Sequence, residues 1–192
     1  MNILILNGSP RKNGSISQML ESMREEAEKA GATVQVVRVD SLQVKPCMGC
    51  MSCREALKCV FPEDGAQETL QKIGKCDLFI IGAPCYWGNL PGQLKVLFDR
   101  MVYGMMGESP RGIPIPLHKG KKAILVSTCT TMYPFNILFN QTRGVVKALK
   151  EILKWSGFKV IASVERGGTK TNPLKEKDLK HCRKVIRKVL KS

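Results

Sequence analysis

Buried strands and amphipathic helices alternate along this chain, as the spacing of its apolar and polar positions indicates. Residues 2–7 include four consecutive aliphatic side chains, a pattern typical of a strand that is buried on both faces of a parallel sheet. Apolar residues then recur every three or four positions from residue 16 to residue 30, and Gly31 stands where a helix would end. The start of the chain therefore predicts a buried strand followed by a helix.

The same alternation continues to the C-terminus. Four further strands are predicted, at residues 33–39, 77–83, 122–128 and 158–164. Three further helices are predicted, at residues 94–102, at about 136–156 and at 179–190. Residues 103–120 are expected to form a long ordered loop that serves as a lid or a subunit contact. Five alternations without repeats or linkers predict an α/β fold with a three-layer, doubly wound parallel sheet.

The loop after the first strand has the composition of an anion-binding site. In a doubly wound sheet, ligands bind beyond the carboxyl ends of the strands, and residues 8–17 join such an end to a helix N-terminus, whose N–H groups attract negative charge. The spacing of the glycines excludes a P-loop and a G-x-G-x-x-G fingerprint. We predict a site for a phosphate monoester, with ligands from Ser9, Arg11, Asn13, Ser15, Ile16 and Ser17. The alternative is a polar turn capped by Ser15.

The loops after the third and fourth strands bring flat rings and small polar side chains to the same edge of the sheet. This combination suits a planar ligand such as a flavin, because the rings offer a flat wall and the small residues let the backbone approach. The predicted ring-binding residues are Pro84, Cys85, Tyr86, Trp87, Gly88, Asn89, Thr128 and Cys129. Tyrosine and tryptophan also serve in packing, and that alternative stays open for Tyr86 and Trp87.

The cysteines divide into a cluster and four scattered residues. The cluster has the spacing C-x2-C-x2-C-x5-C and consists of Cys47, Cys50, Cys53 and Cys59. Two-residue gaps let a short segment direct successive thiolates at one iron-sulfur cube, so we predict that these four bind a [4Fe-4S] cluster. Four thiolates also satisfy tetrahedral zinc, and free thiols are the third interpretation. Among the scattered residues, Cys76 and Cys129 are expected to be small buried hydrophobes.

Length and composition set wider limits. The 192 residues are 43% hydrophobic, which suits a single domain over residues 1–192 with a cysteine-rich insertion at about 45–62. No apolar run reaches the roughly 20 residues of a membrane span, and no secretory leader pattern is present. We therefore expect a soluble protein of the reducing cytoplasm, with no membrane partner and no disulfide framework.

The charge of the chain widens the choice of partners. A net charge of +15 is compatible with nucleic acid, an anionic membrane, an acidic protein or a phosphorylated cofactor. Residues 169–192 hold nine lysines or arginines against two acids, a local net of nine minus two, or +7. Apolar residues at helical spacing in this stretch favour an amphipathic helix with a solvated basic face. Aromatic residues that would stack on bases are scarce there, so we do not expect nucleic acid as a partner.

These motifs together resemble those of a known family. The loop at 8–15 resembles the FMN-phosphate loop of NADPH-dependent FMN reductases. The segment from Pro84 to Asn89, with Lys95 and Asp99-Arg100 in the next helix, resembles their isoalloxazine segment. With the clustered cysteines, the chain is most similar to the iron-sulfur flavoprotein branch. The resemblance covers nearly the whole chain. It implies a flavodoxin-like fold with strand order 2-1-3-4-5, one FMN per subunit, a [4Fe-4S] cluster near the flavin, and a homodimer or tetramer.

The resemblance also implies an activity. The expected protein is an FMN-dependent oxidoreductase that transfers electrons between NAD(P)H or ferredoxin and an acceptor through FMN and the cluster. NAD(P)H is then a transient co-substrate, and the basic surface suits an acidic redox partner such as ferredoxin. We expect no catalytic acid, base or nucleophile from the protein, and we expect His118 and His181 to lie at the surface. The alternatives are a non-catalytic FMN electron carrier and an FMN reductase without a cluster.

Overall fold

Five parallel strands form the central sheet of the computed structural model, which describes residues 1–191. The strands are β1 (Asn2–Asn7), β2 (Thr33–Arg38), β3 (Leu78–Pro84), β6 (Lys122–Thr128) and β7 (Lys159–Arg166). They lie in the order β2-β1-β3-β6-β7, and every neighbouring pair is parallel. When the strands of this sheet are counted by themselves, the order is the expected 2-1-3-4-5.

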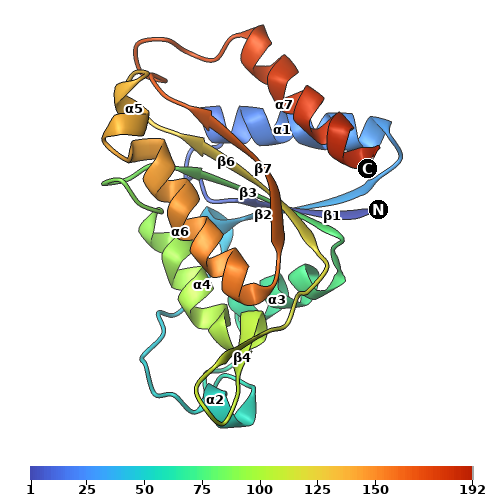
Figure 1. Cartoon of the computed structure of the whole chain (residues 1–192), viewed down its shortest axis with the longest axis vertical. Coiled ribbons are helices and arrows are strands. Elements are labelled where there is room, and N and C mark those ends of the chain that lie inside the picture. The colour runs from blue at the N-terminus through green and yellow to red at the C-terminus, as the bar shows by residue number, and fades with distance from the viewer. Residues whose placement is uncertain (192) are drawn as a thin grey trace.

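Helices cover both faces of the sheet, which gives the three layers seen in Figure 1. One face packs against α1 (Ser15–Lys29) and α7 (Glu176–Leu190), and the other against α3 (Gly65–Lys75), α4 (Gly92–Met105) and α6 (Gln141–Ser156). Side chains of β1 alternate between the two cores: Ile3 and Ile5 pack with α1, whereas Leu4 and Leu6 pack on the opposite side. Burial on both faces explains the unbroken aliphatic run of this strand.

Two helical segments differ from the sequence-based expectation. The helix expected at about 136–156 is divided into α5 (Phe135–Leu138) and α6, because Asn140 between them adopts a left-handed conformation with φ of 52°. The helix α3 was not expected at all. A capping box begins it: the Asp64 carboxylate accepts from the N–H of Ala66, and the Gln67 side chain accepts from the N–H of Asp64.

The region expected to be a long loop at 103–120 has regular structure. The helix α4 continues to Met105, and an antiparallel pair follows, made of β4 (Met106–Glu108) and β5 (Pro114–Pro116). This pair projects from one end of the molecule beside the short helix α2 (Cys53–Ala56) (Figure 1). A short 3-10 turn, η1 (Val39–Ser41), precedes the cysteine segment. The proline-rich stretch is therefore part of a small projecting unit rather than a plain connection.

His118 is buried, contrary to the expectation that it lies at the surface. Its side chain is 6% exposed, its Nε2 lies 2.9 Å from the carbonyl oxygen of Gly104, and its ring lies 5.2 Å from that of Phe158. Burial lowers the pKa of His118, because the charged imidazolium would lose its hydration. His118 is therefore a core residue that joins the end of β5 to α4. His181 is exposed on α7, as expected.

The burial expected for two scattered cysteines is confirmed. Cys76 is 4% exposed and Cys129 is 6% exposed. Burial raises the pKa of the Cys76 thiol to about 11, so this side chain is a neutral thiol near neutral pH.

Within residues 1–191, no helix combines the length and the apolar character needed to cross a membrane.

We expect Ile186→Ala to lower the free energy of unfolding by about 2–5 kcal/mol, because Ile186 is a fully buried contact of α7 with the α1 side of the sheet. Urea unfolding followed by circular dichroism measures the change. Lys184→Ala, on the exposed face of the same helix, is the matched control and should change stability by less than about 0.5 kcal/mol. Equal changes in the free energy of unfolding for the two variants would mean that α7 does not pack against the sheet through Ile186.

Candidate functional site

Three loops meet at the carboxyl edge of the sheet because the strands that precede them are neighbours in register. The N–H of Gly8, after β1, donates to the carbonyl of Gly82 in β3 at 2.8 Å. The N–H of Cys85, after β3, donates to the carbonyl of Thr128 in β6 at 2.7 Å. The predicted phosphate loop and the two predicted ring-binding loops therefore lie side by side, as parallel strand order requires.

The phosphate loop leads into a helix N-terminus that carries no side-chain cap. Gly14 is the N-cap residue of α1, and the first turn of the helix holds no acidic residue. The alternative in which Ser15 caps the helix is therefore wrong. The positive end of the helix dipole and the first N–H groups of α1 remain available to an anion, which is the arrangement that binds phosphate at helix N-termini.

Two serines of the loop hold its shape. Ser9 is 3% exposed, and its Oγ accepts a hydrogen bond from the N–H of Arg11 at 3.3 Å. The Ser17 hydroxyl donates to the carbonyl of Arg11 at 2.9 Å and accepts from the Asn7 side-chain amide at 3.0 Å. Both hydroxyls therefore have partners inside the protein. The loop is a preformed structure rather than a flexible tether.

The other predicted phosphate ligands differ in how they face the solvent. The side chains of Arg11 and Asn13 are exposed, and Ser15 is half-buried at the start of α1. Ile16 is 1% exposed and packs in the core on the α1 side, so only its backbone N–H can serve a ligand. Arg11 is thus the one charged group among the predicted ligands, and it is free to turn toward an anion at the helix end.

The first ring-binding loop is a tight reverse turn. Tyr86 and Asn89 exchange two backbone hydrogen bonds of 3.0 Å, and the two residues between them, Trp87 and Gly88, have positive φ of 54° and 70°. Trp87 is fully exposed at 102% of its reference area, and Tyr86 is 43% exposed. Trp87 therefore has no role in core packing, and its indole is presented to solvent at the site edge.

The backbone of α6 supports this turn directly. A Cβ atom on Gly144 would lie 1.9 Å from the carbonyl oxygen of Gly88, so only glycine fits where the helix meets the turn. The Cys85 thiol donates to the side-chain oxygen of Gln141, in the first turn of α6, at 3.5 Å. Across the site, Thr128 and Cys129 are 4% and 6% exposed. Burial raises the pKa of both Cys85 and Cys129, so neither thiol is poised as a thiolate.

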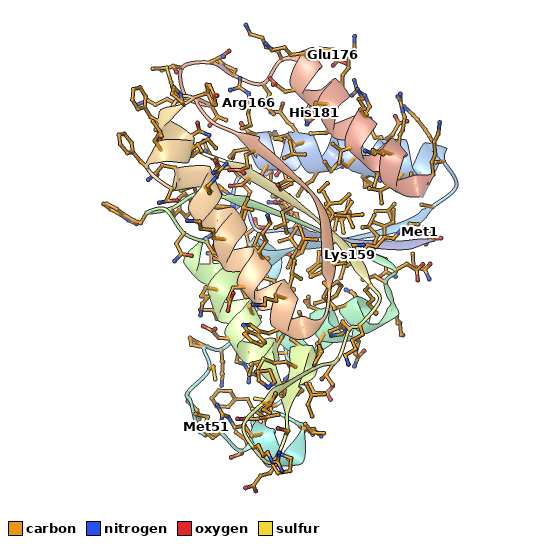
Figure 2. All side chains as sticks on the ribbon, in the orientation of Figure 1. Met1, Met51, Lys159, Arg166, Glu176 and His181 are labelled. Atoms are coloured by element: carbon orange, nitrogen blue, oxygen red, sulfur yellow. The ribbon has the colours of Figure 1, made fainter. Side chains whose placement is uncertain are left out.

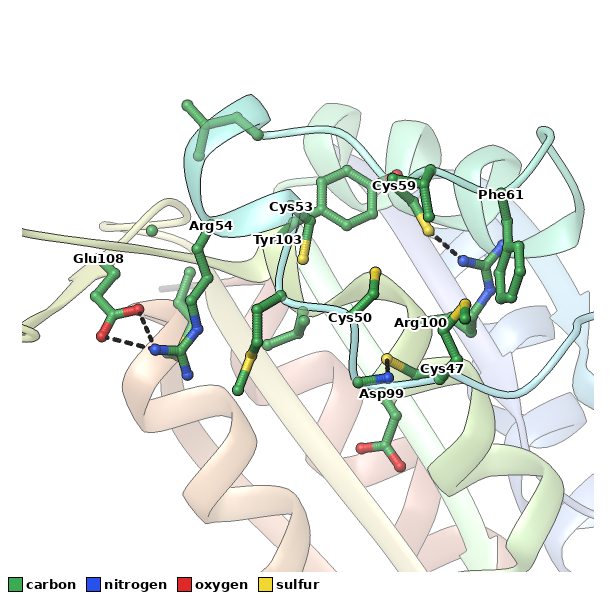
Figure 3. Close-up of a pocket in the computed structure, with 18 residues that line it drawn as sticks. Cys47, Cys50, Cys53, Arg54, Cys59, Phe61, Asp99, Arg100, Tyr103 and Glu108 are labelled. Carbon is green, nitrogen blue, oxygen red and sulfur yellow. Dashed lines mark hydrogen bonds and ion pairs between the residues drawn. The ribbon is translucent and has the colours of Figure 1, made fainter.

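A second site lies where the cysteine segment packs on the last turns of α4 and on β4. A cavity of about 130 Å³ opens there, and all four clustered cysteines line it (Figure 3). Its other walls are mostly apolar and include Leu57, Val60, Phe61 and Met106. On one side of the cavity, Arg54 of α2 forms an ion pair of 2.9 Å with Glu108 of β4. This pair joins the cysteine segment to the β4–β5 pair.

The cysteine thiols differ in their surroundings. Hydrogen bonds from Ser52 lower the pKa of Cys50, whereas burial raises the pKa of Cys53. The N–H of Gly49 donates to the sulfur of Cys47 at 3.5 Å. Gly49 and Met51, which separate the first three cysteines, both have positive φ. These left-handed residues wrap the backbone so that the sulfurs face one cavity, as short cysteine gaps require.

Arg100 forms the buried wall of this cavity. Its side chain is 1% exposed, it pairs with Asp64 at 3.0 Å, and its guanidinium carbon lies 4.7 Å from the centre of the Phe61 ring. One of its terminal nitrogens donates to the Cys59 sulfur (Figure 3). Its Nε is buried without a hydrogen-bond partner among the described residues. The family resemblance placed Arg100 with Asp99 in the helix after the isoalloxazine segment but assigned it no contact with the cysteines, although an arginine on the buried side of the α4 stripe was a usable signal.

The cavity brings together four thiols of the kind that bind metals, but not in the geometry of a metal centre. Among residues 1–191, no three or more histidine, cysteine or acidic side chains stand close enough together to hold a metal ion. All eight cysteines are free thiols. The four thiols and the neighbouring guanidinium fit an anionic iron-sulfur cluster by donor type. Binding would therefore require the segment 47–59 to draw its sulfurs inward.

The helix α4 links the two sites. It begins at Gly92, directly after the turn at the sheet edge, and its residues Asp99 and Arg100 line the cysteine cavity. Asp99 lies seven residues after Gly92 along the helix, a rise of about 10 Å.

The basic helix α7 lies far from the cysteine cavity: Figure 2 places Glu176 and Met51 at opposite ends of the molecule. The lysines of α7 therefore do not frame the cysteine cavity.

Comparison with known proteins shows which family and which relatives this chain resembles. The family model of NADPH-dependent FMN reductases matches residues 1–166. An iron-sulfur flavoprotein of Clostridioides difficile (strain 630) is 30% identical over 195 residues, which cover 99% of this chain and 78% of that protein. An iron-sulfur flavoprotein of Methanosarcina thermophila is 37% identical over 102 residues, 53% of either chain, so the match spans about half the length of that relative.

A solved structure extends the comparison to the fold. The azoreductase from Bacillus anthracis str. Sterne superposes on 99% of this chain and 98% of its own, with a TM-score of 0.75 and 17% sequence identity. At that identity, the likeness shows a shared flavodoxin-like fold and leaves the chemistry to be argued from the residues.

We expect Gly144→Ala to displace the turn at Tyr86–Asn89 and to lower the free energy of unfolding by about 1–3 kcal/mol, because the new methyl group meets the backbone of Gly88. Urea unfolding gives the free energy, and amide chemical shifts of the turn report its displacement. Gly74→Ala is the control: nothing lies within 4 Å of its Cβ position in α3, so it should stabilise by up to about 1 kcal/mol. Unchanged shifts in Gly144→Ala would contradict the contact.

Proposed function

This chain belongs to the NADPH-dependent FMN reductase family, and from that premise we propose that it is an FMN-dependent oxidoreductase that takes electrons from NAD(P)H and passes them to an acceptor. One observation carries the proposal: the uncapped N-terminus of α1 and the two ring-binding loops meet at one edge of the sheet. Phosphate donors and a flat aromatic turn thus stand where an α/β sheet binds its ligand. We further propose that residues 1–192 form one FMN-binding domain with a cysteine-rich insertion at about 45–62.

The phosphate of FMN would bind at the start of α1. The N–H groups of Ser15, Ile16 and Ser17 would donate to it, since the helix has no cap, and the exposed Arg11 and Asn13 side chains would close over it. Ser9 and the Ser17 hydroxyl would act mainly by holding the loop, because both already have partners. Donors fixed before binding reduce the entropy lost when the cofactor binds.

The ring system would lie against the turn and the end of β6. The backbone of Pro84 to Asn89 offers N–H and C=O groups at the edge of the ring, while Thr128 and Cys129 form a small, buried wall. FMN supplies the hydride and single-electron chemistry when it is bound. The residues of this chain bind and orient it, and none is proposed to act as a catalytic acid or base.

We propose that Cys47, Cys50, Cys53 and Cys59 hold a [4Fe-4S] cluster, which supplies one-electron transfer when it is bound. The supporting observation is that all four thiols line one cavity beside a buried guanidinium. The cavity lies about two helical turns along α4 from the sheet edge, so an electron would have a short path between the two sites. An acidic protein such as a ferredoxin is the redox partner that the net charge of +15 favours, and a homodimer or tetramer is the proposed assembly.

An FMN reductase without a cluster is the second candidate. Its supporting observation is that the described cysteines are free thiols and do not surround a common metal position. In that case the cysteine segment would be a thiol-bearing surface element, and electrons would pass from NAD(P)H to the acceptor at the flavin edge alone. Zinc bound by the four thiols is compatible with the same scheme.

Arg11→Ala should weaken FMN binding by about 10- to 100-fold, because a charge-assisted hydrogen bond to phosphate is lost. Fluorescence quenching of free FMN on titration with apoprotein measures the dissociation constant. Lys12→Ala removes the same charge from the neighbouring exposed position and should weaken FMN binding clearly less than Arg11→Ala does. Equal losses would point to general electrostatic attraction, and no loss in either variant would contradict the assigned phosphate site.

Anaerobically purified and reconstituted protein should contain about four irons and four acid-labile sulfides per chain. Colorimetric iron and sulfide analysis gives these numbers, and stoichiometric FMN in the visible spectrum is the internal reference. Cys50→Ser should lower the iron content, whereas Cys76→Ser, outside the cavity, should leave it unchanged. FMN without iron would select the reductase without a cluster; zinc by mass spectrometry would select the zinc interpretation.

A further inference from the structure

We propose that Arg100 is a positioning residue of the cysteine cavity, which fixes the Cys59 sulfur by a hydrogen bond and thereby makes the bound cluster easier to reduce. The inference rests on the proposed [4Fe-4S] site and assigns a role to a residue that binds neither metal nor flavin. Four observations carry it: the burial of the side chain, its rigid anchoring, its contact with a sulfur, and its unpaired nitrogen.

The position of Arg100 on α4 argues against a purely structural role. Its neighbours on the buried side of the helix, Leu97 and Met101, are both fully buried. An apolar side chain at residue 100 would continue that packing surface without the desolvation cost of a charge. Replacing a buried ion pair by apolar residues is often neutral or stabilising, so the pair with Asp64 alone does not explain the arginine. The contact of Arg100 with the Cys59 sulfur explains why an arginine occupies this position.

The guanidinium is held rigidly from two sides. Asp64 accepts from one terminal nitrogen at 3.0 Å, and Asp64 is itself fixed by the N–H of Ala66 at 2.9 Å, at the start of α3. Phe61 covers one face of the guanidinium at 4.7 Å. The other terminal nitrogen is directed at Cys59, the last ligand, which five residues separate from Cys53. Arg100 therefore fixes the position of Cys59, the cysteine that is farthest in sequence from the other three.

A donor aimed at a ligand sulfur acts on the electron affinity of a cluster. Reduction adds negative charge to a centre that already carries four thiolates, and hydrogen bonds to those sulfurs stabilise the added charge. The other charges at the cavity are arranged as pairs that avoid the sulfurs: Arg54 pairs with Glu108, and Asp99 pairs with Lys95. The unpaired Nε of Arg100 leaves one further donor beside the cavity.

Three variants test the role through the reduction potential and the iron content, in reconstituted protein that retains its FMN. Arg100→Met should shift the cluster midpoint potential to more negative values and lower the iron content. Arg100→Lys keeps the charge without the planar fork and should give an intermediate shift. Asp64→Asn leaves the positive charge uncompensated and should shift the potential in the positive direction. Redox titration followed by electron paramagnetic resonance gives the potentials.

The opposite signs of the potential shifts in Arg100→Met and Asp64→Asn distinguish the proposed role from a purely structural one. A structural pair predicts that Arg100→Met and Asp64→Asn both destabilise the fold and move the potential alike or not at all. Arg111→Met is the control, because it removes an exposed arginine from the turn between β4 and β5 that does not line the cavity; it should leave potential and iron content unchanged. Urea unfolding of each apoprotein gives the stability separately.

The outcomes also separate this inference from the proposed cluster. Wild-type protein without iron overturns both. Wild-type protein with about four irons and an Arg100→Met variant of the same potential and iron content overturns the role of Arg100 alone. If Arg100→Met binds too little iron for a titration, Asp64→Asn decides: a positive shift supports the role, and no shift or a negative shift overturns it.

Discussion

Burial of the central strands on both faces is the constraint on which the rest of this structure depends. The cores on the two sides of β1, β3 and β6 leave no room for polar side chains until each strand ends. Because the strands are parallel and in register, those ends coincide at one edge. The polar loops that follow are therefore gathered at that edge by the packing of aliphatic residues far from the ligand. Gly8 shows how tight the arrangement is, since a Cβ there would lie 2.9 Å from Leu94.

The cysteine segment follows a different rule. It leaves the sheet after β2, passes along α4, and encloses its cavity with few regular elements of its own. Its position is set by contacts with buried or paired groups: Arg100 against Cys59 on one side, and Arg54 with Glu108 on the other. The loops at the sheet edge are held in place by hydrogen bonds, whereas the four cysteines of the cavity would have to move closer together to share a metal centre. The two sites thus represent different degrees of preorganisation in one chain.

The sequence predicted the parts of this structure that local patterns control. The aliphatic run of β1, the β6 strand at 122–128 and the end of the α6 helix before Gly157 were all predicted correctly. The helix α3 was missed because its start depends on the Asp64 capping box rather than on a long apolar stripe. The left-handed Asn140 divided a helix that propensity alone would continue. Burial of His118 and the contacts of Arg100 arise from residues distant in sequence, which periodicity does not encode.

The helix α4 has a consequence beyond its role as a scaffold. Its first turn carries no acidic residue and its last turn no basic one, so no charged side chain in either end turn offsets the aligned peptide dipoles. The positive end faces the turn at the sheet edge, and the negative end lies toward the β4 side of the cysteine cavity. Negative charge is therefore favoured near the sheet-edge end of α4 and disfavoured near its β4 end. The backbone of this helix thus gives its two ends different electrostatic surroundings.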